Sequence, residues 1–249
     1  MLAPVGKAML LDVGGVLLLP HLDPVRAAMA AASIDFDETK VPSAHYFGVH
    51  ALDESDRSEW EPEVYLHAYV AALGVTGFRI SAAVEALLLV WADPTVGLWR
   101  HRVTDSIDSL ALLAGADVPL AIVSNSDGTV ERELRALRIC QTGAGDGVQV
   151  ACITDSAVVG VSKPDPAVFA PALRALRIDP GEGVYVGDTE RYDVRGATLA
   201  GLEPVHFDPL GLCRHPRGHR HVASLRELVP GRHERDGAAG LDRAGWGQQ

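Results

Sequence analysis

Residues 8–17 read Ala-Met-Leu-Leu-Asp-Val-Gly-Gly-Val-Leu, an apolar run that ends on a carboxylate and opens into a pair of glycines. A continuous apolar run of this kind predicts a strand that is buried on both faces of a sheet. Asp12 then lies where the strand ends and a tight turn begins, which is where open α/β sheets bind ligands. This stretch therefore indicates a fold class and supplies a first candidate for a functional residue.

Further apolar runs bounded by turn residues follow along the chain. The runs cover 119–123, 149–153, 183–187 and 203–207, and helical patterns cover 130–139, 166–178 and 193–202. Asp165-Pro166 is typical of a helix start, because Asp caps the first turn and Pro is tolerated in it. Strands that alternate with helices predict an α/β fold with a Rossmann-like parallel sheet and helices on both faces.

A long segment after the first strand breaks this alternation. Helical runs occur near 23–32, 61–73 and 81–92, with no convincing strand among them. We therefore expect an α/β core formed by 1–18 and 100–230, and an inserted all-helical cap formed by 19–99. An insertion placed directly after Asp12 would lie over the carboxyl ends of the strands as a lid. A lid of this kind excludes water and selects substrates.

Composition excludes several classes of protein. The 249 residues are 47% hydrophobic and 22% charged, which is ordinary for a soluble globular protein. The chain has 22 Lys and Arg against 33 Asp and Glu, and the resulting net charge of −11 disfavours nucleic acid and anionic membranes as partners. We find no secretory signal and no apolar run of the roughly 18 residues that a membrane-spanning helix needs.

The cysteines indicate a reducing compartment. Cys140, Cys152 and Cys213 are odd in number and widely spaced, with no CxxC pair, a pattern that fits neither a disulfide framework nor a zinc site. We expect reduced thiols in a cytoplasmic protein.

The Gly-rich, charged segment 231–249 lacks apolar periodicity and is expected to be a flexible tail. Oligomeric state leaves no signature in the sequence.

Four short motifs, taken together, resemble those of the haloacid dehalogenase superfamily. They are Asp12-Val13-Gly14-Gly15-Val16, Ser124-Asn125, Lys163-Pro164-Asp165-Pro166, and Gly187-Asp188 with Asp193. The resemblance spans about residues 8–229, and its most specific stretch runs from Val161 to Asp193. The helical insertion lies where that superfamily carries its first type of cap.

The resemblance implies a hydrolase acting on a small phosphorylated metabolite. Asp12 would be the nucleophile, since a carboxylate can accept a phosphoryl group and then lose it to water, dividing one hard step into two. Phosphoryl transfer concentrates negative charge, so the site needs donors and cations. By resemblance, Ser124, Asn125 and Lys163 would bind the phosphate, with Ser124 and Lys163 joining Asp12 as catalytic residues.

The resemblance also implies Mg²⁺, a cation that prefers oxygen ligands and keeps several waters. Its ligands would be Asp12, the backbone carbonyl of Gly14, and Asp188. Asp193 would bind the ion directly or orient a ligand through a hydrogen bond.

Gly14 departs from the usual phosphatase motif of this superfamily. Most of these enzymes have a second Asp there, which protonates the leaving alkoxide and then activates water, and such help is typically worth ~10² to 10⁴ in rate. A substrate with a good leaving group could still react without it. Alternatively, a side chain of the cap could substitute, and the candidates are His21, His45, His50 and Asp53.

Two other functions stay open at this point. A metal-independent 2-haloacid dehalogenase also lacks the second Asp, but its first motif typically has an aromatic residue at the position of Gly14. A catalytically impaired protein that only binds or regulates is the second alternative. Substrate choice would depend on the cap, where the candidate pocket residues are Trp60, Tyr65, Trp91, Trp99 and Arg100.

Overall fold

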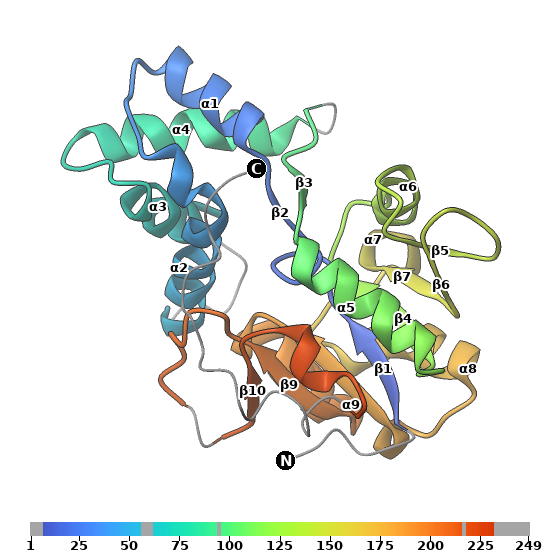
Figure 1. The fold of residues 1–249 in the computed structure, drawn as a ribbon. Helices are drawn as coiled ribbons and strands as arrows, with labels where there is room; N and C mark the ends of the chain where they lie inside the picture. Colours follow the sequence, from blue (N-terminus) through green and yellow to red (C-terminus); the bar gives the residue numbers. More distant parts are fainter. Residues whose placement is uncertain (1–6, 56–61, 94–95, 216–217, 232–249) are drawn as a thin grey trace.

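A computed structural model describes residues 7–55, 62–93, 96–215 and 218–231. Its central sheet has six parallel strands in the order β10-β9-β8-β1-β4-β7 (Figure 1). The strands are β1 (Ala8–Leu11), β4 (Leu120–Ser124), β7 (Ile153–Asp155), β8 (Gly183–Gly187), β9 (Glu203–Phe207) and β10 (Arg220–Val222). The predicted Rossmann-like α/β fold is confirmed. Trp60 and all but the first residue of the predicted tail lie outside the described residues.

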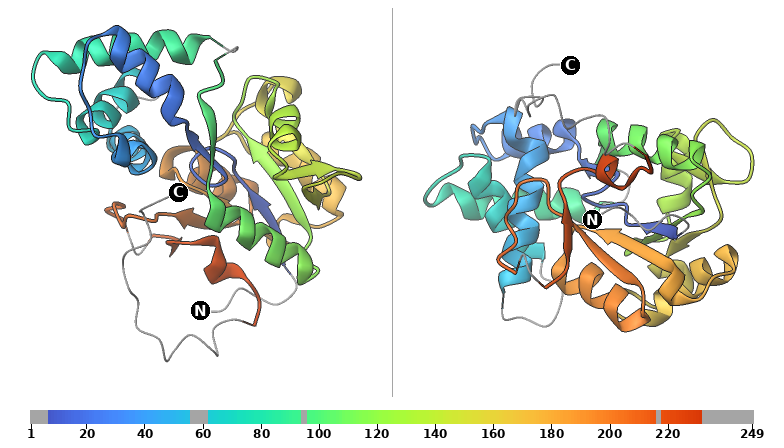
Figure 2. Two further views of the ribbon diagram at one scale, coloured as in Figure 1. Left: turned by 45° about the horizontal axis from the view of Figure 1, so that its top comes forward. Right: turned by 60° about the horizontal axis from the view of Figure 1, so that its bottom comes forward.

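Helices pack on both faces of this sheet, as the two views of Figure 2 show. Met9 and Leu11 face one apolar cluster, and Leu10 faces the other, as expected for the period of two along a strand. The first cluster is covered by α5 (Thr104–Gly115) and α6 (Val130–Ala136), and the second by α8 (Ala170–Leu176) and α9 (Arg195–Ala200). The short helix α7 (Ser156–Val159) follows β7.

The later helices begin differently from the prediction. The predicted helix 166–178 starts as a 3-10 turn (Pro166–Phe169) that leads into α8, and the Asp165 side chain caps it by accepting from the Ala167 N–H at 2.9 Å. The predicted helix 193–202 starts earlier, as a π-helical turn (Glu190–Val194) that leads into α9.

One strand prediction is wrong, and one strand of the central sheet was not predicted. The apolar run 149–153 is not one strand, because β6 (Val148–Val150) pairs with β5 (Cys140–Thr142) in a small separate sheet, and only β7 joins β4. An apolar run cannot show which neighbour each part of it will pair with. Strand β10 was missed, because Arg220-His221-Val222 is short and polar, as is common at the edge of a sheet.

In the described part of the chain, four α-helices lie between β2 (Leu18–Pro20) and β3 (Trp99–Arg102), two strands that pair antiparallel and run side by side in Figure 1. The helices are α1 (Leu22–Ala31), α2 (Val41–Glu54), α3 (Pro62–Ala72) and α4 (Arg79–Ala92), and they enclose an apolar cluster of their own. The expectation of no strand in 19–99 is wrong at its two ends.

Helix α2 was absent from the predicted helical runs. Gly48 and several polar residues dilute its apolar pattern. A Cβ at position 48 would lie 2.5 Å from the Tyr65 ring, so glycine permits the close approach of α2 and α3. Seven residues of α2 are nevertheless buried, among them His45.

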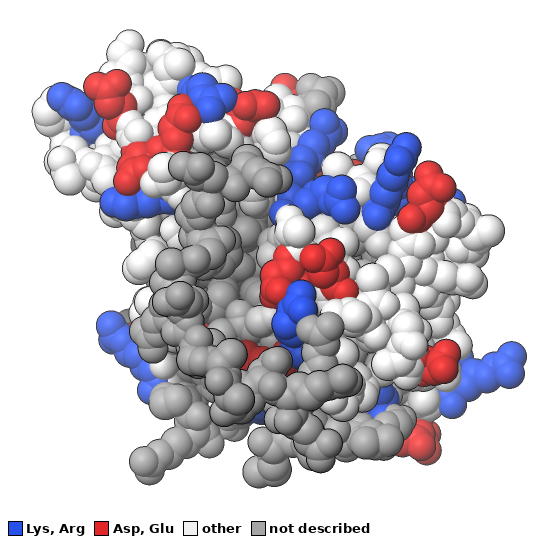
Figure 3. Space-filling model, viewed as in Figure 1, with Lys and Arg blue, Asp and Glu red and all other residues white. Residues whose placement is uncertain are grey.

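The surface carries mixed charge. On the face drawn in Figure 3, Lys and Arg side chains are interspersed with Asp and Glu. Among the described helices, none combines the length and the apolar character needed to cross a membrane.

Candidate active site

Three polar residues meet at the carboxyl ends of adjacent strands. Asp12 follows β1, Ser124 ends β4, and Asp188 follows β8, the two strands that flank β1. All three are buried, and all three line a cavity of about 650 Å³. A cavity of this size is typical of small-molecule sites.

The ammonium group of Lys163 contacts three polar side chains near this edge of the sheet. Its Nζ donates to the Asp193 carboxylate at 2.7 Å and to the Tyr185 hydroxyl at 2.8 Å, and it lies 2.9 Å from the Asp12 carboxylate. Burial by itself would lower the pKa of Lys163, but the charges of Asp12 and Asp193 outweigh it and raise the pKa above its usual value. The side chain is therefore a buried cation shared by two carboxylates.

Asp193 is held from both sides. One carboxylate oxygen accepts from Lys163 and from the Tyr185 hydroxyl, and the other accepts from the Thr189 N–H at 2.9 Å and the Thr189 hydroxyl at 2.6 Å. Burial opposes ionisation, but Lys163 and Thr189 together lower the pKa of Asp193. Tyr185 and Thr189 were missed in the sequence. The one indication in the sequence was Tyr185, whose hydroxyl is a polar group within the apolar run of β8.

Asp12, Asp188 and Asp193 offer carboxylate oxygens that lie within 4.8 Å of one another. Burial raises the pKa of Asp12 to about 7 and the pKa of Asp188 well above its usual value, although Lys163 opposes both shifts. One buried lysine does not balance three carboxylates, so the cluster suits a hard divalent cation.

Gly15 allows the turn after β1 to pass against this cluster. Its φ is +70°, and a Cβ there would lie 1.9 Å from the nearer Asp188 carboxylate oxygen. Gly14 is different, since a Cβ there would meet its nearest atom, on the Trp99 ring, at 4.0 Å. Only the second glycine of the pair is therefore required by packing.

His45 is the one candidate substitute acid that lines the main cavity. Its Nε2 lies 2.7 Å from the Asp188 carboxylate and its Nδ1 lies 2.9 Å from the Tyr65 hydroxyl. Burial lowers the pKa of His45 to about 3, against the opposing effect of Asp12. The ring is neutral and both nitrogens are engaged, so in this arrangement it orients Asp188 rather than a leaving group.

The other three candidate acids lie elsewhere. His21 caps α1 by accepting from the Asp23 N–H at 3.2 Å. The Asp53 carboxylate accepts from the backbone N–H groups of Glu190 at 2.8 Å and Arg191 at 3.0 Å, which ties α2 to the turn before Asp193. His50 lines a smaller, separate cavity together with Asp53.

Asn125 holds the backbone of Lys163. Its side-chain amide donates to the Lys163 carbonyl at 3.1 Å and accepts from the Lys163 N–H at 2.8 Å. The Asn125 side chain thus positions the loop that carries the lysine. Phosphate binding by Ser124 and Asn125 stays a prediction.

One part of the cavity wall is aromatic. Tyr65, Trp91 and Trp99 line it, with the Trp91 and Trp99 ring centroids 5.7 Å apart. Arg100, also predicted for the pocket, is not among the lining residues. Among the lining residues in the described part of the chain, Lys163 is the only Lys or Arg.

Comparisons with known proteins point to one family. Residues 7–201 match the family model of the haloacid dehalogenase-like hydrolases. The chain is 38% identical over 89 residues to a phosphoserine phosphatase of Thermus thermophilus, a match that covers 36% of this chain and 33% of that protein. The chain thus spans about a third of the length of this curated relative.

Solved structures share the fold. A phosphatase from Thermococcus onnurineus superposes with a TM-score of 0.53 at 21% identity, covering 89% of this chain and 95% of that one. A 2-haloacid dehalogenase from Pseudomonas syringae superposes with a TM-score of 0.51 at 21% identity, covering 92% and 96%. Phosphatases and dehalogenases both use this fold, so the residues of the site must decide between the two reactions.

Proposed function

Because the chain belongs to the haloacid dehalogenase-like hydrolase family, we propose that it is a Mg²⁺-dependent phosphatase acting on a small phosphate monoester. The observation that carries this proposal is the buried lysine among three carboxylates at the floor of the cavity. A phosphate group brings the negative charge that Lys163 and a bound cation would offset.

Asp12 is the proposed nucleophile. The Val13 N–H donates to one of its oxygens at 2.7 Å, and Lys163 lies 2.9 Å from the other, so the carboxylate is held in one orientation. Its attack forms a bond to phosphorus and breaks the bond to the ester oxygen, which leaves with a proton from solvent. Water then attacks the same phosphorus, releases inorganic phosphate and restores Asp12.

The remaining residues of the site would support this phosphoryl transfer. Asp193 holds Lys163 in place, and Ser124 and the loop fixed by Asn125 would border the phosphate. Mg²⁺ would be held by Asp12, Asp188 and the Gly14 carbonyl, and would stabilise the charge that builds up on the transferring group.

The charge balance favours this reaction over metal-free dehalogenation. Attack on carbon by a metal-independent enzyme requires only one carboxylate beside its cation. Here Lys163 is already shared between Asp12 and Asp193, and Asp188 adds a further buried carboxylate that is costly to ionise without a second cation.

The helical insertion would act as a cap that selects the substrate. Its Tyr65 and Trp91, with Trp99 at the start of β3, present an apolar wall, and Lys163 is the only lining Lys or Arg among the described residues. We therefore propose a substrate whose organic part is uncharged and partly apolar. A second anionic group would find no cationic partner in this wall.

Hydrolysis of an aryl phosphate panel with and without Mg²⁺ tests the proposal. Asp12→Asn should abolish turnover, whereas Asp146→Asn, which changes an exposed carboxylate on a loop, should leave it unchanged. Turnover that is undiminished by a chelator would exclude the metal-dependent mechanism. Halide release from a 2-haloacid without Mg²⁺ would establish the dehalogenase, and absence of all turnover would favour a binding protein.

A matched substrate pair tests the cap. Phenyl phosphate should be hydrolysed with a higher kcat/KM than 4-carboxyphenyl phosphate, because the added carboxylate would face the aromatic wall. Equal kcat/KM values would contradict the proposed substrate class while leaving the phosphatase proposal intact.

We further propose a cytoplasmic location, which suits the three free thiols among the described residues.

A further inference from the structure

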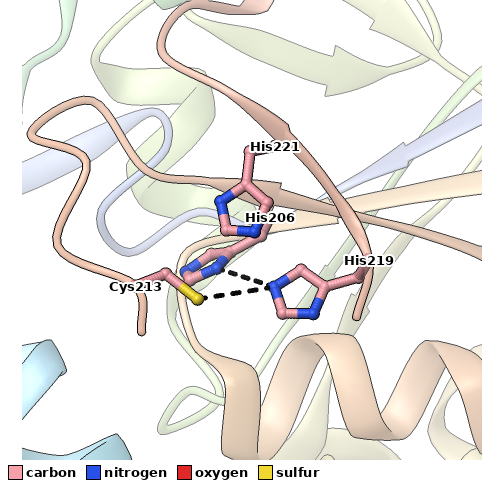
Figure 4. A group of neighbouring side chains, drawn as sticks. All are labelled: His206, Cys213, His219 and His221. Atoms are coloured by element: carbon pink, nitrogen blue, oxygen red, sulfur yellow. Dashed lines mark hydrogen bonds between the residues drawn. The ribbon is translucent and has the colours of Figure 1, made fainter. Parts of the chain in front are cut away.

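We propose that His206, Cys213, His219 and His221 form a second metal site, and that its occupant is Zn²⁺. Each residue offers one ligand atom, and these four atoms lie within 4.8 Å of one another. Figure 4 shows the side chains turned toward a common centre. Zinc binds imidazole nitrogen and thiolate sulfur, and its closed structural sites hold four such ligands in a tetrahedron.

Two of the separations between ligand atoms fit such a tetrahedron closely. Zinc bonds of about 2.0–2.1 Å to nitrogen and about 2.3 Å to sulfur place two nitrogens about 3.3 Å apart, and nitrogen and sulfur about 3.6 Å apart. His206 Nδ1 and His219 Nε2 are 3.1 Å apart, and Cys213 Sγ and His219 Nε2 are 3.8 Å apart. Each pair needs to move by only a few tenths of an ångström to bind the ion.

The outer nitrogens also fit a metal site. His206 Nε2 lies 3.1 Å from the Asp188 carbonyl oxygen. A carbonyl only accepts, so Nε2 carries the proton and Nδ1 turns its lone pair toward the cluster. His221 Nδ1 lies 3.6 Å from the Asp208 carboxylate, while its Nε2 is buried and has no hydrogen-bond partner. Metal-binding histidines commonly have a carbonyl or carboxylate on the far nitrogen in this way.

The pairing of β9 with β10 brings the histidines together. His206 and His221 are register partners on β9 and β10, and the ring of His219, directly before β10, stacks on the ring of His221. The three ring centroids are 4.6–5.1 Å apart. Imidazoles this close would repel one another if they were protonated, whereas neutral rings around a shared cation would not.

Binding requires one proton to leave. The Cys213 thiol donates to the Glu190 carboxylate at 3.1 Å, and on metal binding it loses this proton to solvent while its sulfur lone pair forms the metal bond. His219 Nε2, which now donates to His206 Nδ1, passes its proton to its own Nδ1 through solvent. The histidines thus remain neutral ligands.

This second site is chemically distinct from the carboxylate cluster but is connected to it. The carboxylates would hold a hard ion through oxygen, whereas the second site offers nitrogen and sulfur. Through its hydrogen bond to the Asp188 carbonyl, His206 joins the second site to the strand end that carries Asp188. A bound zinc ion would fix the tautomer of His206 and so strengthen this connection.

Titration of metal-depleted protein with Co²⁺ tests the site independently of catalysis. Co²⁺ replaces zinc in tetrahedral sites and gives a thiolate charge-transfer band only when sulfur is bound. We expect one equivalent to produce this band in the wild type, in Asp12→Asn and in Cys152→Ser, a control at another cysteine. Cys213→Ser should remove the band. A band that persists in Cys213→Ser would overturn the proposal, as would saturation with Co²⁺ without any band.

A measurement on the unaltered chain avoids any variant that fails to fold. One equivalent of Zn²⁺ should slow alkylation of Cys213 at least tenfold, measured by peptide mass spectrometry, with Cys152 as the internal reference. Equal protection of both thiols, or protection of neither, would refute the site. Neither measurement depends on phosphatase activity, so its outcome is separate from that of the proposed function.

Discussion

Gly14→Asp should increase hydrolysis of substrates with poor leaving groups. A side chain at this position has room, because a Cβ would meet its nearest atom at 4.0 Å, and the position lines the cavity beside Asp12. The introduced carboxyl would supply the proton that the departing alkoxide otherwise takes from water. Such catalysis is worth ~10² to 10⁴ in rate, or about 3 to 5 kcal/mol of activation free energy.

The surroundings favour the protonated form of that carboxyl. Asp12, Asp188 and Asp193 lie on the same side of the cavity, and negative charge at a few ångströms raises the pKa of an added acid. The carboxyl would therefore keep its proton near neutral pH, as a general acid must. The gain should shrink as the leaving group improves, because a good leaving group needs less protonation.

Steady-state rates across a series from alkyl to nitrophenyl phosphates provide the assay. The wild type should show a steep dependence on leaving-group pKa, and Gly14→Asp should show a flatter one with the largest gain for alkyl esters. Gly14→Asn is the matched control, since it has the same shape and no acidic proton. Equal rates for the Asp and Asn variants on alkyl phosphates would refute the reasoning.

Three other changes have definite expected outcomes. Gly15→Ala should abolish activity and lower thermal stability, since its Cβ would lie 1.9 Å from the Asp188 carboxylate, and wild-type melting temperature and turnover would contradict this. His45→Gln should weaken Mg²⁺ binding about 10- to 100-fold by calorimetry, because His45 orients Asp188, and an unchanged affinity would exclude that role. Burial raises the pKa of Asp53 from 3.8 to about 7, so the folded chain holds this proton more tightly than the unfolded chain. The associated stability is complete below about pH 4 and is lost as the pH rises through about 7. Urea unfolding of chelated protein between about pH 5 and about pH 8 should show this loss in the wild type and not in Asp53→Asn.

The fold was predictable where one strand corresponds to one apolar run. β1, β4 and β8 lie in continuous apolar segments, and Asp12, Ser124 and Asp188 stand at their carboxyl ends, so adjacency in a parallel sheet was enough to bring them together. Lys163 and Asp193 were predicted from their motifs, but their shared hydrogen bonds with Tyr185 and Thr189 depend on side-chain orientation, which spacing does not reveal.

What could not be predicted depends on contacts between distant segments. His45 meets Asp188 across 143 positions of sequence, and Asp53 meets Glu190 across 137. Both start from α2, a helix whose apolar pattern is diluted. The cluster around Cys213 was missed for a related reason. Spacing was judged among cysteines alone, whereas the partners of Cys213 are histidines in or directly before two strands that pair in the folded chain.

The position of β1 in the sheet has a consequence for how the protein is made. This strand comes near the start of the chain, yet its neighbours are β4 and β8, and residues 8–11 pair with 183–186. The strand that carries Asp12 therefore leaves the ribosome long before both of its neighbours exist. Until then its apolar residues lack a partner on at least one edge, and the carboxylate lacks Lys163 and Asp188. A nascent chain that ends before β8 therefore cannot contain the complete site.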